Sequence, residues 1–424
     1  MYVNLSRNFT LMEAYPTGPY AALKIRDYRF FISARFCITL AIQIQSVVVA
    51  LQIYEITQDA FSLGLIGWAE AIPSIGVSLY AGHIADIINR KRIIVTCVSI
   101  LIFCSDSLLS FTTDPGDYLL TFGAFPIYGV IFISGIARGF LTPAQFSFMP
   151  QLVPRELYTN AITWNSTLWE TAAITGPAVG GLLFGLFGFT VAYAVDVSLI
   201  IIGLTLMISV ANKPVPPITS EEGVAEKIKA GLRFVWHNKT ILSAISLDLF
   251  AVLFGGAVAL LPIFADKILH VGSFELGILR ASPSIGALLM AFYITHNPIS
   301  KNAGKTLLYC VAGFGCCMIL FGISTNFWLS LSLLILSGVF DCVSVIIRGT
   351  LLQTLTPENM KGRVSAVNHI FVGSSNEIGM FESGLVAKLM GAVPSVIFGG
   401  FMTLGVVSVT SWVSKSIRNL QRLD

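Results

Sequence analysis

The chain matches itself at a fixed offset of 203 residues. Five small or rigid positions keep their identity at that spacing without a gap, which unrelated sequences would rarely do. A register of glycines and prolines shared across half the chain indicates one unit that occurs twice. The matching pairs are Ser134 and Ser337, Gly135 and Gly338, Pro154 and Pro357, Gly176 and Gly379, and Gly181 and Gly384.

Composition places this duplicated unit in a membrane. Hydrophobic residues make up 55% of the 424 residues and charged residues only 12%, whereas a soluble domain carries about 25% charged residues. Apolar stretches of roughly 18–25 residues recur along the chain, each long enough to cross about 30 Å of hydrocarbon as a helix. We therefore predict an all-α membrane protein with twelve transmembrane helices in two pseudo-symmetric six-helix bundles.

The placement of the basic residues gives the expected orientation. Under this count, 20 of the 26 Lys and Arg fall on one face of the membrane, and only Lys267 and Lys388 lie on or near the other. Lys and Arg are enriched in cytoplasmic loops, so both termini are expected in the cytoplasm. The sequence thus predicts a multi-pass protein of the cell (inner or plasma) membrane.

A polar stretch in mid-chain separates the two repeats. Val224, Ile228, Leu232 and Val235 recur at helical spacing there, which predicts an amphipathic helix on the inner membrane surface or a solvated linker helix. The expected segments are a cytoplasmic N-terminus at 1–28, a six-helix bundle at 29–210, a cytoplasmic linker at 211–239, a second six-helix bundle at 240–414 and a cytoplasmic C-terminus at 415–424.

A tight basic turn joins the second and third predicted spans. The run GHIADIINRKR extends from Gly82 to Arg92. Gly82 permits close helix approach, and Asn89 tolerates a left-handed backbone. The run resembles the loop motif of the major facilitator superfamily, G-x-L-A-D-r-x-G-r-k-r. It departs from that motif at Ile87, where a basic residue is usual, and at Asn89, where glycine is usual.

The resemblance implies a conformational latch in this loop. In the family, the Asp and the following Arg form a charge network that holds the two halves in the outward-facing state. That role would fall to Gly82, Asp86, Arg90 and Arg92. An ordinary basic loop that anchors the chain at the headgroups is the alternative.

The fifth span carries a strip of small residues around a proline. Gly176 and Gly180 are four residues apart, a spacing that lets helix backbones touch, and Pro177 removes a helix hydrogen bond. With Gly181, this strip resembles the antiporter motif of the same superfamily, G-x-x-x-G-P-x-x-G-G, with Ala172 at the first glycine. The resemblance implies export rather than uptake, and helix packing alone is the alternative.

Two further stretches narrow the resemblance within the superfamily. Residues 138–156 at the end of the fourth span and their counterpart at 351–364, together with Leu260–Pro262, resemble the branch that contains enterobactin exporters and macrolide-type efflux proteins. The resemblance covers nearly the whole chain, but it carries little information about the substrate.

Twelve ionisable side chains fall inside the predicted spans. A charge at mid-bilayer costs at least about 2.5–3.5 kcal/mol, so each needs a partner, a water-filled cavity or a proton. An inert bundle would hardly retain so many. They are Glu70, Asp106, Glu170, Asp196, Asp248, Asp341, Glu377, Glu382, Arg35, Arg138, Arg280 and Arg348.

The superfamily resemblance sorts these residues by helix. Helices 1, 4, 7 and 10 would line the cavity and helices 3 and 6 would be peripheral, so Asp106 and Asp196 are expected to be structural. Glu170 and Glu377 are the expected proton acceptors, because a carboxyl in an apolar cavity holds a proton more readily. Structural pairing is an equal alternative for any single acid.

The expected substrate and proton cavity combines six of these side chains. Two of them, Arg138 and Asp341, occupy equivalent positions of the two repeats and have opposite charge, so they could pair across the cavity floor. The cavity residues are Arg35, Arg138, Glu170, Asp248, Asp341 and Glu377, and the possible pair is Arg138 with Asp341.

We therefore expect a secondary active transporter that exports a small organic molecule, an amphipathic drug-like compound or a siderophore, by proton antiport and alternating access. The alternative is a proton-independent facilitator, or a metal or metabolite transporter of the same fold. The histidines show no metal-ligand spacing and no nucleotide-binding loop is present, so we expect no metal, no cofactor beyond the proton gradient and no enzymatic activity. The expected partners are the substrate and the lipid bilayer, without nucleic acid, for a monomeric protein.

Overall fold

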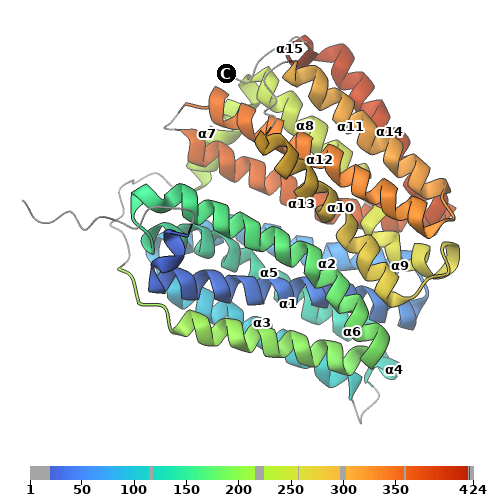
Figure 1. Ribbon diagram of the computed structural model, residues 1–424, viewed down its shortest axis with the longest axis horizontal. Coiled ribbons are helices and arrows are strands. Elements are labelled where there is room, and N and C mark those ends of the chain that lie inside the picture. The colour runs from blue at the N-terminus through green and yellow to red at the C-terminus, as the bar shows by residue number, and fades with distance from the viewer. Residues whose placement is uncertain are drawn as a thin grey trace, which may run out of the picture.

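The computed structural model describes residues 20–113, 118–214, 224–255, 257–296, 302–357, 360–418 and 420. Most of the predicted N-terminal segment, residues 215–223 of the predicted linker and the last four residues lie outside these ranges. The described chain is helical throughout, as the composition predicts (Figure 1).

The N-terminal half comprises α1 to α6 and the C-terminal half α8 to α14. The helices of the N-terminal half are α1 (Arg26–Thr57), α2 (Ala60–Ile87), α3 (Arg90–Thr112), α4 (Tyr118–Phe122), α5 (Phe125–Phe148) and α6 (Tyr158–Ile208). The remaining α-helices are α7 (Val224–His237), α8 (Lys239–Phe254), α9 (Leu261–Ile263), α10 (Ser273–His296), α11 (Ala303–Ile323), α12 (Phe327–Leu355), α13 (Lys361–Met390), α14 (Ala392–Val413) and α15 (Lys415–Arg418). Short turns complete the path as η1 (Ala22–Lys24), η2 (Met149–Gln151), η3 (Arg155–Leu157), η4 (Ala257–Leu260) and the π-turn η5 (Phe264–Ile268).

Twelve membrane crossings follow from these helices. Ten helical stretches of the described chain are long and apolar enough to span a bilayer. One of them, α6, has 51 residues and breaks at Gly188, whose φ of 75° is outside the helical range, so it supplies two crossings. The twelfth is α13, which has 30 residues but a more polar sequence. The fold is thus two six-helix bundles, as predicted.

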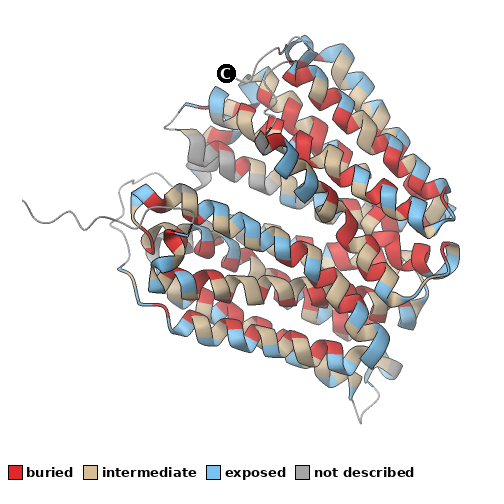
Figure 2. Cartoon of the chain, viewed as in Figure 1, coloured by how far each residue is buried: buried red, intermediate tan, exposed pale blue. Residues whose placement is uncertain are grey.

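The outer surface of the bundles is apolar, which is what a lipid environment requires. Trp412, Phe292 and Phe103 are 80%, 71% and 65% exposed, and such large exposed apolar side chains would be costly in water. Figure 2 shows buried residues along the faces that the helices turn toward one another, and also where the two halves approach each other at the right of the view.

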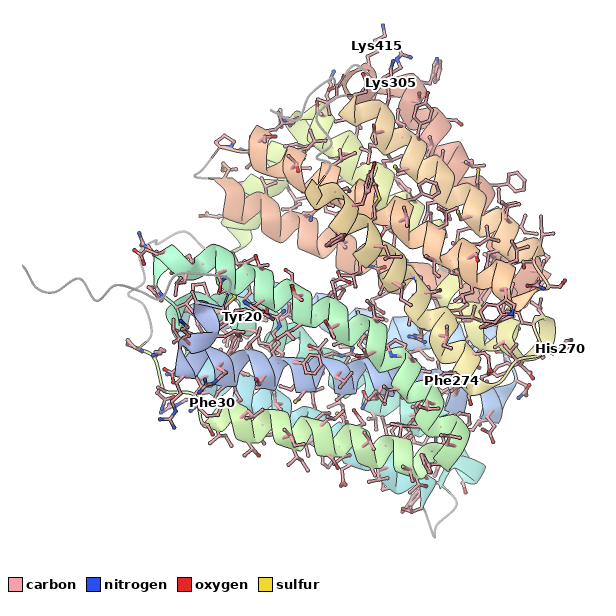
Figure 3. All side chains as sticks on the ribbon, in the orientation of Figure 1. Tyr20, Phe30, His270, Phe274, Lys305 and Lys415 are labelled. Atoms are coloured by element: carbon pink, nitrogen blue, oxygen red, sulfur yellow. The ribbon has the colours of Figure 1, made fainter. Side chains whose placement is uncertain are left out.

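Each bundle has two ends, which we name by the chain termini. The termini end is where α1 begins and α14 finishes, and the far end is opposite. Figure 3 labels Tyr20 and Phe30 at the left and Lys305 at the top, and all three lie at the termini end. His270 and Phe274 lie at the right, at the far end.

The two halves touch backbone to backbone near the far end. A Cβ on Gly64 of α2 would lie 3.0 Å from the Cα of Gly384 on α13. A Cβ on Gly181 of α6 would lie 3.0 Å from the Cα of Gly277 on α10. These crossings of α2 with α13 and α6 with α10 are possible only because glycine has no side chain.

The same seam between α2 and α13 opens toward the termini end. Gly384 lies two helical turns after Glu377 on one face of α13, and Gly373 lies one turn before Glu377 on that face. Among the described residues, no atom lies within 4 Å of the position that a Cβ on Gly373 would take. Packing along α13 therefore changes from backbone contact to open space over three turns.

A glycine substitution series on α2 tests this seam. We expect Gly64→Val to lower the stability of the protein by about 1–3 kcal/mol, the usual cost of overpacking, because the new side chain meets α13. Gly76→Val on the same helix is the matched control, since no atom of the described chain lies within 4 Å of its Cβ position. Thermal unfolding in detergent measures both; equal melting temperatures for the two variants would contradict the close crossing.

Candidate functional site

Four charged side chains from both halves meet at the centre of the molecule, and we call them the central charge cluster. They are Glu70 on α2, Arg138 on α5, Arg280 on α10 and Glu377 on α13. Arg138 Nη1 lies 2.5 Å from Glu70 Oε1, and each of these side chains is 23% exposed. Glu377 interacts electrostatically with the other three. Two acids and two bases thus balance across the interface between the halves.

The cluster leaves hydrogen-bonding capacity unused. Arg280 Nη2 donates to Ser46 Oγ on α1 at 2.8 Å, which links the two halves directly. Glu377 Oε2 and Arg138 Nε are buried and have no hydrogen-bond partner in the described protein. A buried polar atom without a partner is costly. Glu377 Oε2 can therefore accept a proton or a hydrogen bond, and Arg138 Nε can donate a hydrogen bond to water or a ligand group.

Small residues bring the helices of the cluster together. A Cβ on Gly135 of α5 would lie 2.8 Å from the carbonyl oxygen of Glu70, so α5 approaches α2 closely there and places Arg138 one turn further on. A Cβ on Gly67 would lie 2.6 Å from the carbonyl oxygen of Glu377. Two glycines, each about one turn from a cluster residue, therefore fix the distances between the charges.

A second pair of acids faces across the halves. The carboxylates of Glu170 on α6 and Asp341 on α12 interact electrostatically, and both residues are half-buried. The expected pairing of Arg138 with Asp341 is not formed, because Arg138 pairs with Glu70 of α2 instead. Repeat symmetry placed the two residues at equivalent positions of their halves, but equivalent positions need not face each other.

A buried ion pair lies inside the C-terminal half. Arg348 Nη1 on α12 contacts Asp248 Oδ2 on α8, and their side chains are only 7% and 6% exposed. The equivalent of Asp248 in the N-terminal half is Gln45 on α1, which donates to Asp196 Oδ2 at 3.0 Å and to Ser105 Oγ at 2.8 Å. The Arg348–Asp248 pair lies within the C-terminal half, and the contacts of Gln45 lie within the N-terminal half. Each of them joins helices of a single bundle.

Of the remaining expected residues, Arg35 and Asp106 lie apart from these groups. Arg35 on α1 is half-buried and close to Tyr28, and the described residues give it no ion pair. Asp106 on α3 is exposed, which agrees with the peripheral position expected for it. Asp196 is fully buried.

The loop between α2 and α3 takes a different form from the one expected. Asn89 has a φ of −58° rather than a left-handed backbone, and its Oδ1 accepts a hydrogen bond from the Arg92 amide at 3.3 Å. It is therefore the N-cap of α3. Gly82 lies within α2, Arg90 begins α3, and the side chain of Asp86 is outside the described part of the chain. The predicted latch stays a prediction.

The antiporter-like strip on α6 packs against both halves. Gly176 and Gly180 lie against α1, where a Cβ on Gly180 would be 3.0 Å from the Ile44 carbonyl oxygen. Gly181 and the carbonyl oxygen of Pro177 lie against Gly277 on α10. One short segment thus holds α6 to its own bundle and to the opposite bundle.

Among the described residues, no group of three or more His, Cys, Asp or Glu side chains is arranged to hold a metal ion.

Comparison with known proteins agrees with this architecture. The chain belongs to the transmembrane secretion effector family of the major facilitator superfamily, whose signature covers residues 17–421. It is a multi-pass membrane transporter.

Relatives of established activity are similar over nearly the full length. The enterobactin exporter EntS of Shigella boydii serotype 18 is 25% identical over 94% of this chain and 92% of its own. EntS of Escherichia coli O1:K1 is 25% identical over the same shares.

Solved structures share the fold at low identity. The nucleoside transporter NupG superposes with a TM-score of 0.73 at 12% identity, over 92% of this chain and 100% of its own. A bacterial homologue of the iron transporter ferroportin, in an inward-facing state, gives 0.71 at 14% identity, over 93% and 99%. These likenesses confirm the major facilitator fold.

Sequence reasoning did not place Glu70 and Arg280 in the cavity. Both are among the charges inside the predicted spans, but neither lies on helix 1, 4, 7 or 10, which the resemblance assigns to the cavity. The one available signal was the midplane position of Glu70, which predicts that the acid needs a cation nearby. Pairing it with Arg138 requires the crossing of α2 and α5, which the sequence pattern does not reveal.

The buried pair gives a prediction about stability. Asp248→Asn leaves Arg348 buried without its partner, and we expect a loss of about 3–5 kcal/mol, as for other broken buried pairs. Asp106→Asn, at an exposed acid, should change stability by less than about 0.5 kcal/mol. Thermal unfolding in detergent distinguishes the two; an Asp248→Asn variant as stable as the control would show that the pair contributes little.

Proposed function

We propose that this protein exports a small organic molecule across the inner membrane in exchange for protons, by alternating access around the central charge cluster. The observation that carries the proposal is Glu377. It is a carboxyl from the C-terminal half whose Oε2 is buried and without a hydrogen-bond partner, beside an acid and two bases of the cluster.

The balance of the cluster explains how one proton could alter the interface. With Glu377 ionised, the two negative and two positive charges of the cluster balance, and both arginines attract Glu377. When Glu377 takes up a proton, one positive charge is left over at a site of low dielectric, where charge interactions are strong. The excess positive charge then weakens the attraction that the cluster provides between the two halves.

The packing along α13 supports a state open at one end. The halves meet at Gly64 and Gly384 near the far end, and space surrounds Gly373 toward the termini end. With the termini in the cytoplasm, as the basic residues predict, this is an inward-facing state. Substrate would enter from the cytoplasm and reach the cluster before the halves exchange their contacts.

Two observations support the proposed direction of transport and the proposed substrate class. The strip from Gly176 to Gly181 resembles a motif that accompanies export, and the relatives with an established activity are exporters of enterobactin, a siderophore. At 25% identity the substrate itself does not transfer. A siderophore or an amphipathic drug-like compound remains the proposed class.

In the proposed cycle the substrate and the proton compete for the cluster. Substrate from the cytoplasm displaces the proton of Glu377, the halves close at the termini end, and the far end opens. A proton from outside then replaces the substrate and favours the return. Glu170, which faces Asp341 across the halves, is the second candidate for carrying a proton.

Neutral substitutions of the two glutamates test the coupling. We expect Glu377→Gln to abolish transport driven by a pH gradient in proteoliposomes, while exchange of substrate at equal pH on both sides continues, because only the proton step is lost. Glu170→Gln tests the second acid in the same way, and Asp106→Asn is the control for a carboxyl outside the cavity. The substrate is first chosen by screening a deletion strain against a compound panel and for secreted siderophore.

Normal pH-driven transport in both glutamine variants would refute the proton assignment. Flux that ignores the pH gradient in the wild-type protein would instead indicate a facilitator of the same fold.

A further inference from the structure

Both lysines at the far end reach across to an aromatic ring of the opposite half. Lys388 Nζ, near the end of α13, lies 4.5 Å from the centre of the Phe61 ring on α2. Lys267 Nζ, in η5, lies 5.9 Å from the centre of the Tyr54 ring on α1. In each contact the cation belongs to the C-terminal half and the ring to the N-terminal half. The face of an aromatic ring attracts a cation at these distances.

Further contacts hold the two rings in place. The hydroxyl of Tyr54 donates to Asp266 Oδ2 at 2.8 Å, which is a third link between the halves. Tyr54 is 6% exposed, so its ring is fixed by burial as well. The Phe61 ring packs edge-on against Phe381 of α13 with centroids 5.8 Å apart. The lysines therefore meet rings that are already oriented.

These contacts lie at the rim, beyond the glycine crossings. Lys388 is one turn past Gly384 on α13, and Tyr54 is near the end of α1. A cavity of about 240 Å³ lies beside Tyr54 and Asp266, bounded by α1, α6, η5 and α10. Because side chains do not fill the space between the halves there, the rim contacts contribute to closure directly.

We propose that Lys267 and Lys388, with Tyr54, Phe61 and Asp266, form a far-end latch that holds the halves together in the state open at the termini end. The proposal rests on the alternating access of the proposed function. Lysine over a ring suits this use, because parting the halves returns the ammonium to water and leaves no unpaired buried acid behind. Such a latch is weak enough to open in every cycle.

The first test compares substitutions that remove or keep the two cations. In Lys267→Met with Lys388→Met, the apolar stems remain and the charges are lost. If each contact has the strength of an exposed cation–π pair, we expect the equilibrium between the closed and open far end to shift about fivefold to thirtyfold toward the open state. Lys267→Arg with Lys388→Arg is the matched control and should stay closed, since arginine also binds ring faces.

Hydrogen–deuterium exchange of the full-length protein in lipid nanodiscs measures the shift without substrate or a pH gradient. Peptides covering residues 54–61 and 384–390 should exchange faster in the methionine pair and at the wild-type rate in the arginine pair. Unchanged exchange in the methionine pair, or equal loosening in the arginine pair, would overturn the latch. Because the readout uses no proton step, it stands apart from the outcome for Glu377.

A double-mutant cycle guards against simple misfolding. Tyr54→Leu removes the ring and hydroxyl from the other half, so it should loosen the far end at least as much as Lys267→Met. Combining the two should add little to Tyr54→Leu alone, because both break the same contact. Fully additive effects would overturn the direct contact between Lys267 and Tyr54.

Discussion

The structure depends on keeping charged side chains balanced inside a membrane. An unpaired charge in hydrocarbon is costly. The central charge cluster avoids unpaired charges by bringing together two acids and two bases from four helices. Arg138 and Glu70 pair within one half, whereas Arg280 and Glu377 belong to the other. Each half therefore brings one acid and one base, and Glu377 interacts with charges of both halves, which makes their interface sensitive to any added proton or charged ligand.

Glycine determines where the halves approach each other. Gly64 with Gly384, and Gly181 with Gly277, set two backbone contacts near the far end, while the charges lie nearer the middle. The two kinds of contact differ in character. Backbone packing is indifferent to pH, whereas the cluster is not, so protonation can bias a movement that the glycines permit. The antiporter-like strip links the N-terminal bundle to the opposite bundle, because it packs on α1 and α10 at once.

The sequence predicted the fold well because its signals are local or repeated. Apolar stretches long enough to cross a bilayer, the 203-residue repeat and the loop motif each point to twelve helices in two bundles. The kink at Gly188 divides α6 into two spans, which also agrees with that count. Pairings were harder. Glu70 and Arg138 are 68 residues apart and meet only because Gly135 lets α5 close on α2, a three-dimensional contact that periodicity cannot show. Asn89 tolerates a left-handed backbone but does not adopt one, and its side chain caps α3 instead.

The join at Gly188 has a mechanical consequence. No loop separates the fifth span from the sixth, so there is no slack to absorb a displacement of one relative to the other at that end. The fifth span carries the glycine strip that presses on the opposite bundle, and the sixth is anchored through Asp196 to Gln45 on the first. A tilt imposed at the interface therefore reaches the back of the bundle both through this corner and through α1, on which both spans pack, so that the half moves as a rigid body rather than helix by helix.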